Sequence, residues 1–428
     1  MIRRLKEILP TILRSDFGNI LFIVGVAIYW SLHWIRFIAM GFITSSDTST
    51  YFAAGELFAN GGIDYLRTPI YPLICHIMQH YFGEYVLESL TALHLIVFYI
   101  SIIFLYRTIS LFTDKWACKF IPTALYAWSI PIYEMCLYIM TESLSISGMV
   151  ILIYCISRII VGKAGRGTIW SAALILLFLV FLRPFNVCFI PILAIIIYLT
   201  YKKGTLKHLK SAIISLSATC AILCSYCLWF MHTYGVFAFS YVSTLNLFMI
   251  SCGDQISELP YNELTEEIQI GHGQDIYCVW FDKENCAAEA KKNLKENTAH
   301  FVKGKIILIG KSCFKVFPHA KTSLAYEYAI IFQCVSMNVV FIALTALIPF
   351  ELWLWMRKRR RLVSIIALHI LICSLSIVTA LAGSSNGEIE RLSMPMFPSL
   401  CLLVGLLAEQ TNFRLQESAV QQSQQFCN

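Results

Sequence analysis

The chain has 428 residues, of which 58% are hydrophobic and 14% are charged, and its formal net charge is +7. Soluble domains carry about 25% charged residues, so this composition, with a mean hydropathy of +0.68, excludes a soluble globular protein and predicts a polytopic membrane protein. The basic residues stand in clusters between apolar runs, as the positive-inside rule expects, so we expect membrane lipids and no nucleic acid as partners.

The apolar runs predict ten membrane-spanning helices of about 20 residues each, and because several runs are short, a count between nine and eleven also fits. The first run, from Phe17 to Ile35, is longer than the hydrophobic part of a secretory signal and is followed by others, so we interpret it as a span. Prolines predict a kink or break in the third span, at Pro122 and Pro131, and in the last, at Pro395 and Pro398. The predicted spans cover residues 17–42, 86–106, 117–135, 143–160, 168–183, 185–201, 211–232, 326–350, 362–383 and 392–410.

The basic residues also predict the orientation of these spans. Lysine and arginine clusters fall in every second loop, and the short loops between them hold very few. Both termini are therefore expected in the cytoplasm, with the chain in the plasma or inner membrane. The predicted inner clusters lie at 3–14, 107–119, 158–166, 202–210 and 357–361.

Two segments between spans are long enough to form structure outside the membrane. The first is the outer loop of residues 43–85, and the second covers residues 233–325, where apolar positions recur at helical spacing. The expected fold is therefore all-α: a transmembrane core at 1–232, a small helical extracytoplasmic subdomain at 233–325, and C-terminal spans with a short cytoplasmic tail at 326–428.

The sixteen cysteines do not indicate a disulfide scaffold, because most lie inside apolar runs, where cysteine behaves as a small hydrophobe. Nothing in the sequence indicates a site for a divalent metal or for another cofactor. Four cysteines lie in the long polar segment with a spacing that matches no metal motif and determines no pairing: Cys252, Cys278, Cys286 and Cys313.

Isolated charged residues gather on the outer side of the predicted membrane. A charge at a membrane boundary is costly unless it is partnered, so such residues are candidates for a functional site. Four separate outer loops contribute them, next to the ends of apolar helices, as a polar active site at the outer surface needs. They are Asp47, Glu56, Asp64 and Arg67, then Glu134 and Glu142, then Arg183, and finally Glu388, Glu390 and Arg391.

Short motifs at these positions resemble those of the lipid-dependent, multi-pass glycosyltransferases of the GT-C fold, which include protein O-mannosyltransferases and the aminoarabinose transferases of lipid A. The motifs are DTSTY at 47–51, RTPIYP at 67–72, TESL at 141–144, LRP at 182–184 and ERLSMP at 390–395. The resemblance covers residues 17–200 and the last span, whereas residues 233–325 match no pattern. Thr48 is a departure, because many relatives carry an acidic residue directly after the aspartate, and this weakens the case for a metal-binding acidic pair.

The resemblance implies a sugar donor on a polyprenyl phosphate and an acceptor hydroxyl on a glycan, lipid or protein, with inversion at the anomeric carbon. Asp47 would be the general base, and arginines would stabilise the charge that develops on the departing phosphate. The sugar and the acceptor do not follow from the sequence. The residues implied in substrate binding are Tyr51, Arg67, Tyr71, Glu142, Arg183 and Arg391.

Each of these residues also has a purely structural explanation. Asp47 suits the cap of a following helix and Glu142 suits a first helical turn, where the helix dipole favours a carboxylate. Arg183 and Arg391 suit contacts with lipid headgroups, and Arg67 suits a charge in a loop. The tyrosines, like Trp128, suit the interfacial aromatic belt. Glu56 and Asp64 are expected at the loop surface. The scattered histidines are not expected to bind a metal: His232, His272 and His319.

Two other functions remain open at the level of sequence. A transporter or flippase for a lipid-linked glycan would carry charges at midplane depth on several spans, whereas here the charges sit at one edge. A surface-polysaccharide ligase would use basic residues of its long outer loop, and the segment around Lys311 to His319 offers some.

Overall fold

A computed structural model describes residues 15–37, 44, 46–202 and 204–241, together with the isolated positions 292, 295–296, 298–299, 398 and 401–402. Within these ranges every regular element is a helix, and five helical stretches are long and apolar enough to cross a membrane. This confirms the predicted all-α membrane protein. Most of the segment 233–325 beyond residue 241, the spans at 326–350 and 362–383, and most of 392–410 lie outside the described residues, so the count of ten spans stays a prediction.

The helices follow the predicted order, with two additional helices in the first outer loop. The predicted spans at 86–106, 143–160, 168–183 and 211–232 each correspond to one helix, and the described part of the span at 17–42 is also one helix. The predicted span at 185–201 consists of a short 3₁₀ helix, Pro184–Cys188, followed by an α-helix, Phe189–Lys202. The elements are α2 (Asp16–Phe37), α3 (Ser46–Ala59), α4 (Ile70–Phe82), η1 (Gly83–Tyr85), α5 (Val86–Ile109), α6 (Trp116–Ala127), α7 (Ile130–Leu137), α8 (Glu142–Ile160), α9 (Arg166–Leu182), η2 (Pro184–Cys188), α10 (Phe189–Lys202) and α11 (Leu209–Tyr234).

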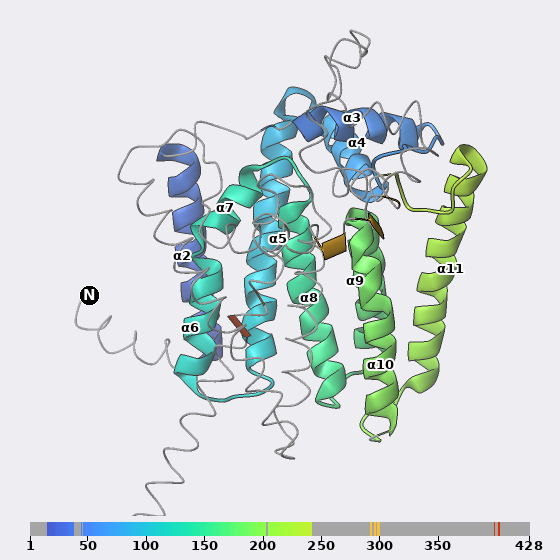
Figure 1. Cartoon of the computed structure of the whole chain (residues 1–428). Helices are drawn as coiled ribbons and strands as arrows, with labels where there is room; N and C mark the ends of the chain where they lie inside the picture. The colour runs from blue at the N-terminus through green and yellow to red at the C-terminus, as the bar shows by residue number, and fades with distance from the viewer. Residues whose placement is uncertain are drawn as a thin grey trace, which may run out of the picture.

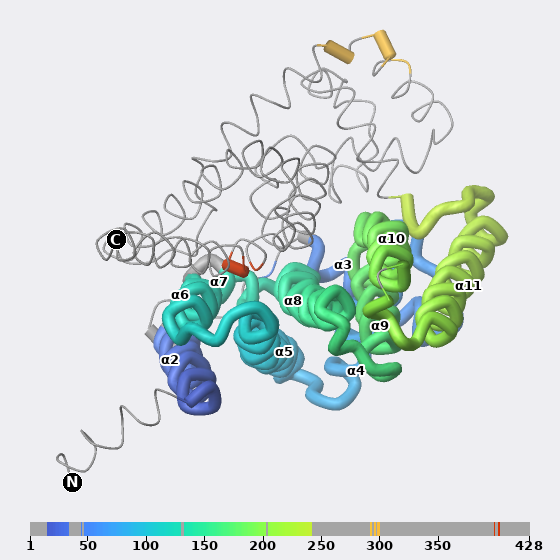
Figure 2. Tube along the Cα trace, turned by 90° about the horizontal axis from the view of Figure 1, so that it is seen from below, coloured from blue at the N-terminus to red at the C-terminus, as the bar shows by residue number. Residues whose placement is uncertain are grey.

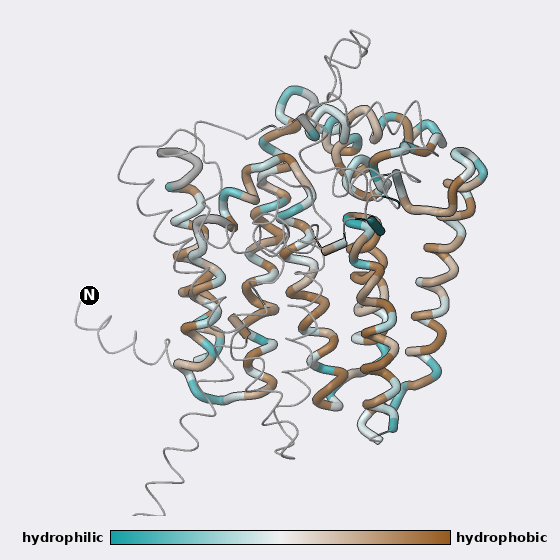
Figure 3. The backbone as a smooth tube through the Cα atoms, viewed as in Figure 1, coloured by the Kyte–Doolittle hydropathy of each residue, from teal (hydrophilic) through white to brown (hydrophobic). Residues whose placement is uncertain are grey.

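The long helices stand side by side, and α3 and α4 lie across one end of them (Figure 1). Seen along the bundle, α5 and α8 lie in the middle, with α2 and α6 on one side and α9, α10 and α11 on the other (Figure 2). The middles of the helices are hydrophobic and the ends are more hydrophilic (Figure 3), as a membrane protein requires.

Small residues allow α8 to occupy this central place. Ser143, Ser145, Ser147 and Gly148 are all buried, and small residues let helix backbones approach closely inside a membrane. A side chain at Gly148 would meet Leu179 of α9 at 2.9 Å. The first residue of α8, Glu142, is therefore brought to the middle of the bundle end.

The predicted third span is broken into two helices, which confirms the expectation from its prolines. The chain leaves α6 at Trp128 and Ser129, and Ser129 has an extended backbone. Pro131 lies in the first turn of α7, where the missing N–H of proline removes no helical hydrogen bond. Pro122 is accommodated inside α6.

At the end of the bundle opposite α3, a polar cluster ties α2 to α5 and α6. Lys119, predicted as an inner-loop charge, is buried in α6 and forms an ion pair with Asp16. The Tyr106 hydroxyl donates to the same carboxylate at 2.9 Å, and Asn19 accepts a hydrogen bond from the Trp116 indole at 2.8 Å. This end of the bundle also carries the basic loops. Charged residues of the described chain therefore gather at two opposite ends of the bundle, this one and the end that carries α3.

The first outer loop is largely helical and is packed on itself. Sequence alone suggested a helix near residues 48–59, but α4 was not anticipated. Gly55 of α3 faces α4 so closely that a Cβ atom would lie 2.3 Å from the carbonyl oxygen of Pro72 and 3.0 Å from Cβ of His76. Backbone cannot yield as a flexible side chain can, so the packing of α3 on α4 requires a glycine here.

We expect Gly55→Ala to lower the thermal-unfolding midpoint of the detergent-solubilised protein by the equivalent of about 1–3 kcal/mol, because the added methyl group forces α3 away from α4. Gly25→Ala is the matched control, since a Cβ atom added at Gly25 of α2 would meet no atom within 4 Å. The control should be neutral or slightly stabilising. Equal midpoints for the two variants would contradict the close packing of α3 on α4.

Candidate active site

Asp47 lies in the first turn of α3, and its carboxylate is partly exposed. The side chain is 32% exposed, and Oδ1 accepts a hydrogen bond from Nη2 of Arg67 at 2.7 Å in an ion pair. A carboxylate in the first turn is also favoured by the helix dipole. Because α3 begins at Ser46, Asp47 stands inside the helix rather than before it.

Arg67 is held against one face of α3. Its Nε donates to Thr50 Oγ1 at 3.0 Å, its Nη1 lies 3.4 Å from the Tyr51 hydroxyl, and its guanidinium lies 4.5 Å from the centre of the Tyr51 ring. Positions 47, 50 and 51 share one helical face, so a single turn of α3 contacts the whole guanidinium. The sequence indicated Asp47 and Tyr51 as site residues, but not Thr50.

Asp64 shapes the turn that presents Arg67. Its Oδ1 accepts the backbone N–H groups of Leu66, at 2.9 Å, and of Arg67, at 2.5 Å. Burial raises the pKa of the Asp64 carboxyl, and these two hydrogen bonds and the Arg67 charge only partly offset that effect. The expected surface carboxylate is therefore a partly buried element of the turn.

A second ion pair joins the start of α8 to the end of α9. Arg183 donates from Nη2 to Oε1 of Glu142 at 2.6 Å and from Nε to Thr141 Oγ1 at 3.1 Å. Glu142 is only 2% exposed and Arg183 is 11% exposed. The guanidinium is thus directed into the protein, and its Nη1 is buried without a hydrogen-bond partner among the described residues.

The turn after α9 fixes the direction of Arg183. The carbonyl of Leu179 accepts the backbone N–H of Arg183 at 2.8 Å and the side-chain amide of Asn186 at 2.9 Å. Arg183 has an extended backbone, and Pro184 then begins η2. Asn186, which no sequence motif indicated, closes this turn.

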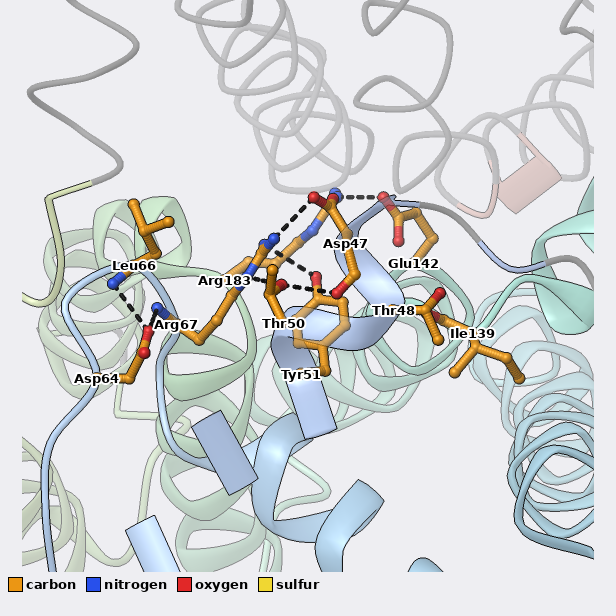
Figure 4. A network of polar contacts seen from close by, with 10 residues as sticks. All are labelled: Asp47, Thr48, Thr50, Tyr51, Asp64, Leu66, Arg67, Ile139, Glu142 and Arg183. Atoms are coloured by element: carbon orange, nitrogen blue, oxygen red, sulfur yellow. Dashed lines mark hydrogen bonds and ion pairs between the residues drawn. The ribbon is translucent and has the colours of Figure 1, made fainter. Parts of the chain in front are cut away.

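The two ion pairs form one cluster around Tyr51, as Figure 4 shows. Tyr51 is buried, and its hydroxyl interacts electrostatically with all four charged groups. Burial raises the pKa of Tyr51 most strongly, Arg67 and Arg183 lower it, and Glu142 and Asp47 raise it again. The net direction is upward, so Tyr51 remains a neutral hydroxyl among four charges.

The remaining predicted residues take different places. Tyr71 is buried beneath Tyr51 with the two rings edge to face, and Glu134 is buried in α7. Thr48, at the position where relatives carry an acid, lies with its hydroxyl 3.4 Å from the carbonyl of Ile139 and links α3 to the turn before α8.

Arg391 lies outside the described residues. Within the described ranges, no group of histidine, cysteine, aspartate and glutamate side chains is arranged to hold a metal ion.

The chain matches no family model, no curated protein and no solved structure. The resemblance to glycosyltransferases therefore rests on the motifs themselves, and the function has to be argued from the geometry of the site.

We expect Arg183→Met to destabilise the protein by about 3–5 kcal/mol, because the substitution leaves the buried Glu142 carboxylate without this guanidinium. Adding Glu142→Gln should recover a large part of the loss, since the buried charge is then gone. A double-mutant cycle on thermal unfolding in detergent measures this coupling. If the losses of stability of the two single variants simply add in the double variant, the ion pair does not couple α8 to α9.

Proposed function

We propose that this chain is a membrane glycosyltransferase that moves a sugar from a polyprenyl phosphate to an acceptor hydroxyl at the outer face of the membrane, with inversion. One observation carries the proposal: two arginine–carboxylate pairs from four separate segments meet around Tyr51 at one end of an apolar helix bundle. Asp47 is the most exposed member of the two pairs, and so the best placed to meet a substrate.

The proposed orientation follows from the division of charges. The basic loops gather at the end of the bundle that holds Asp16 and Lys119, and positive loops face the cytoplasm. The opposite end, with α3 and both arginine–carboxylate pairs, would then face outward, where sugars reach an enzyme on lipid carriers. Both termini would lie in the cytoplasm, in the plasma or inner membrane of the cell.

In the proposed reaction, the acceptor oxygen attacks the anomeric carbon of the donor sugar. The bond between that carbon and the phosphate oxygen breaks, and the polyprenyl phosphate leaves with the electron pair. The acceptor proton passes to the carboxylate of Asp47, which acts as general base. A single displacement of this kind inverts the anomeric carbon.

The arginines have different places in this reaction. Arg67 is engaged by Asp47, Thr50 and Tyr51 and orients the base. Arg183 has a buried Nη1 without a partner among the described residues, so we assign it to the departing phosphate, whose oxygens suit a guanidinium. Arg391, at the outer end of the last predicted span, would add a second contact with the phosphate or the sugar, and Tyr71 would support the donor site through its packing on Tyr51.

The positions of charges favour this function over a transporter. In the long helices α5, α8, α10 and α11, the aspartate, glutamate, lysine and arginine residues stand only near the ends, as at Glu88 and Arg107 of α5. A transporter places ionisable groups near the membrane midplane. A site at the surface of the bundle instead suits a lipid-held donor.

We expect Asp47→Asn to lower the rate of sugar transfer by about 10²- to 10⁴-fold, the usual contribution of a general base, while binding of the donor lipid is retained. Asparagine keeps the shape of the side chain and an oxygen for Arg67 but cannot take the proton. The assay follows labelled sugar leaving polyprenyl phosphate in membranes that contain the protein. Glu56→Gln, an exposed carboxylate on the same helix, is the matched control and should transfer normally.

Transfer by Asp47→Asn at the wild-type rate would remove Asp47 as the base. If wild-type protein transferred no sugar from any polyprenyl phosphate tested but moved the lipid across the membrane, the transporter function would replace the transferase.

A further inference from the structure

A stack of side chains runs from the charged cluster into the interior of the bundle. The guanidinium of Arg67 lies over the ring of Tyr51, the ring of Tyr71 meets Tyr51 edge to face with centroids 4.8 Å apart, and the ring of His94 lies nearly parallel to Tyr71 at 5.9 Å. His94 belongs to α5 and is fully buried, and no sequence pattern indicated it. A histidine inside a membrane span calls for a specific partner.

The hydrogen bonds of His94 define its tautomer. Nδ1 lies 3.1 Å from the carbonyl oxygen of Cys136, and a carbonyl only accepts, so Nδ1 carries a hydrogen. In a neutral ring with its hydrogen on Nδ1, Nε2 is an acceptor. The Tyr71 hydroxyl, 3.3 Å away, therefore donates to Nε2. One nitrogen holds the turn at the end of α7 and the other holds Tyr71.

We infer that His94 is a positioning residue of the candidate active site: by fixing the hydroxyl of Tyr71 it fixes the ring against which Tyr51 packs, and Arg67 lies over the ring of Tyr51. Tyr71 is 1% exposed and Tyr51 is 6% exposed, so neither ring has solvent to move into. Arg67 in turn holds the carboxylate of Asp47 at 2.7 Å. The consequence for catalysis rests on the proposed transferase function, whereas the consequence for the placement of Arg67 does not.

The competing explanation is that His94 only joins α5 to α7 through Cys136, as polar residues often do between membrane helices. The two hydrogen bonds of the His94 ring can be removed one at a time, and this distinguishes the two explanations. The amide nitrogen of asparagine takes the place of Nδ1 as a donor, and the amide oxygen of glutamine takes the place of Nε2 as an acceptor. His94→Asn therefore keeps a donor for the Cys136 carbonyl but loses the acceptor for Tyr71, and His94→Gln does the reverse.

The first measurement needs no substrate. Phenylglyoxal modification of Arg67 is followed by mass spectrometry, with Arg183 in the same molecule as the internal reference. We expect His94→Asn to raise the rate at Arg67 several-fold relative to Arg183, and His94→Gln to leave that ratio at the wild-type value. Tyr71→Phe, which removes only the hydroxyl that donates to Nε2, should behave as His94→Asn does and serves if either histidine variant fails to fold.

The second measurement uses the transfer assay. His94→Asn and Tyr71→Phe should lower kcat by about 10- to 100-fold, because the carboxylate of Asp47 is then displaced from the acceptor hydroxyl. His94→Gln should retain most of the wild-type rate. Equal effects of the asparagine and glutamine variants on Arg67 modification would overturn the inference and leave His94 as a contact between helices. If the wild type transfers no sugar, the proposed function fails, and the modification ratios alone decide the positioning role.

Discussion

The burial of Tyr51 between two arginine–carboxylate pairs is the constraint on which this end of the structure depends. A single charge at the edge of an apolar bundle is costly, and each pair neutralises its own members. The pairs bring together α3, the turn before α4, the start of α8 and the end of α9, which are distant in sequence. Loss of either pair would leave a charge beside a buried ring, so the four segments are held to one arrangement.

The first outer loop is anchored to the bundle on several sides, which keeps α3 in place over the ends of α8 and α9. Thr48 contacts the turn before α8, and Gly55 lets α3 pack directly on α4. At the other side, the Tyr234 hydroxyl donates to the carbonyl of Ile63 at 2.6 Å, and the backbone N–H of Tyr241 donates to the carbonyl of Tyr65 at 2.8 Å. The beginning of the second long outer segment is thus attached to the turn that presents Arg67.

The sequence predicted the helical spans, the break near Pro131 and the gathering of charges at one end, because each depends on local composition. It did not predict which charges pair, since that depends on how helices far apart in sequence pack. Lys119 was expected in a loop and is buried with Asp16, and Asp64 was expected at the surface and shapes a turn. A role for His94 was not predicted, because a single histidine in an apolar run belongs to no local sequence pattern. Its contacts with Tyr71 and Cys136 depend on how α4, α5 and α7 pack.

The charges of the two pairs cancel, and this bears on how the site would meet an anionic lipid. Two carboxylates and two guanidiniums have no net charge, so long-range attraction between the four groups and a phosphate is weak, and binding would depend on directed hydrogen bonds. Arg67 directs Nε, Nη1 and Nη2 at groups of α3, whereas Arg183 keeps a buried Nη1 that forms no hydrogen bond with a described residue. In the proposed transfer reaction the two arginines would therefore have different tasks: Arg67 would orient the base, and Arg183 would stabilise a phosphate oxygen as its bond to the sugar breaks.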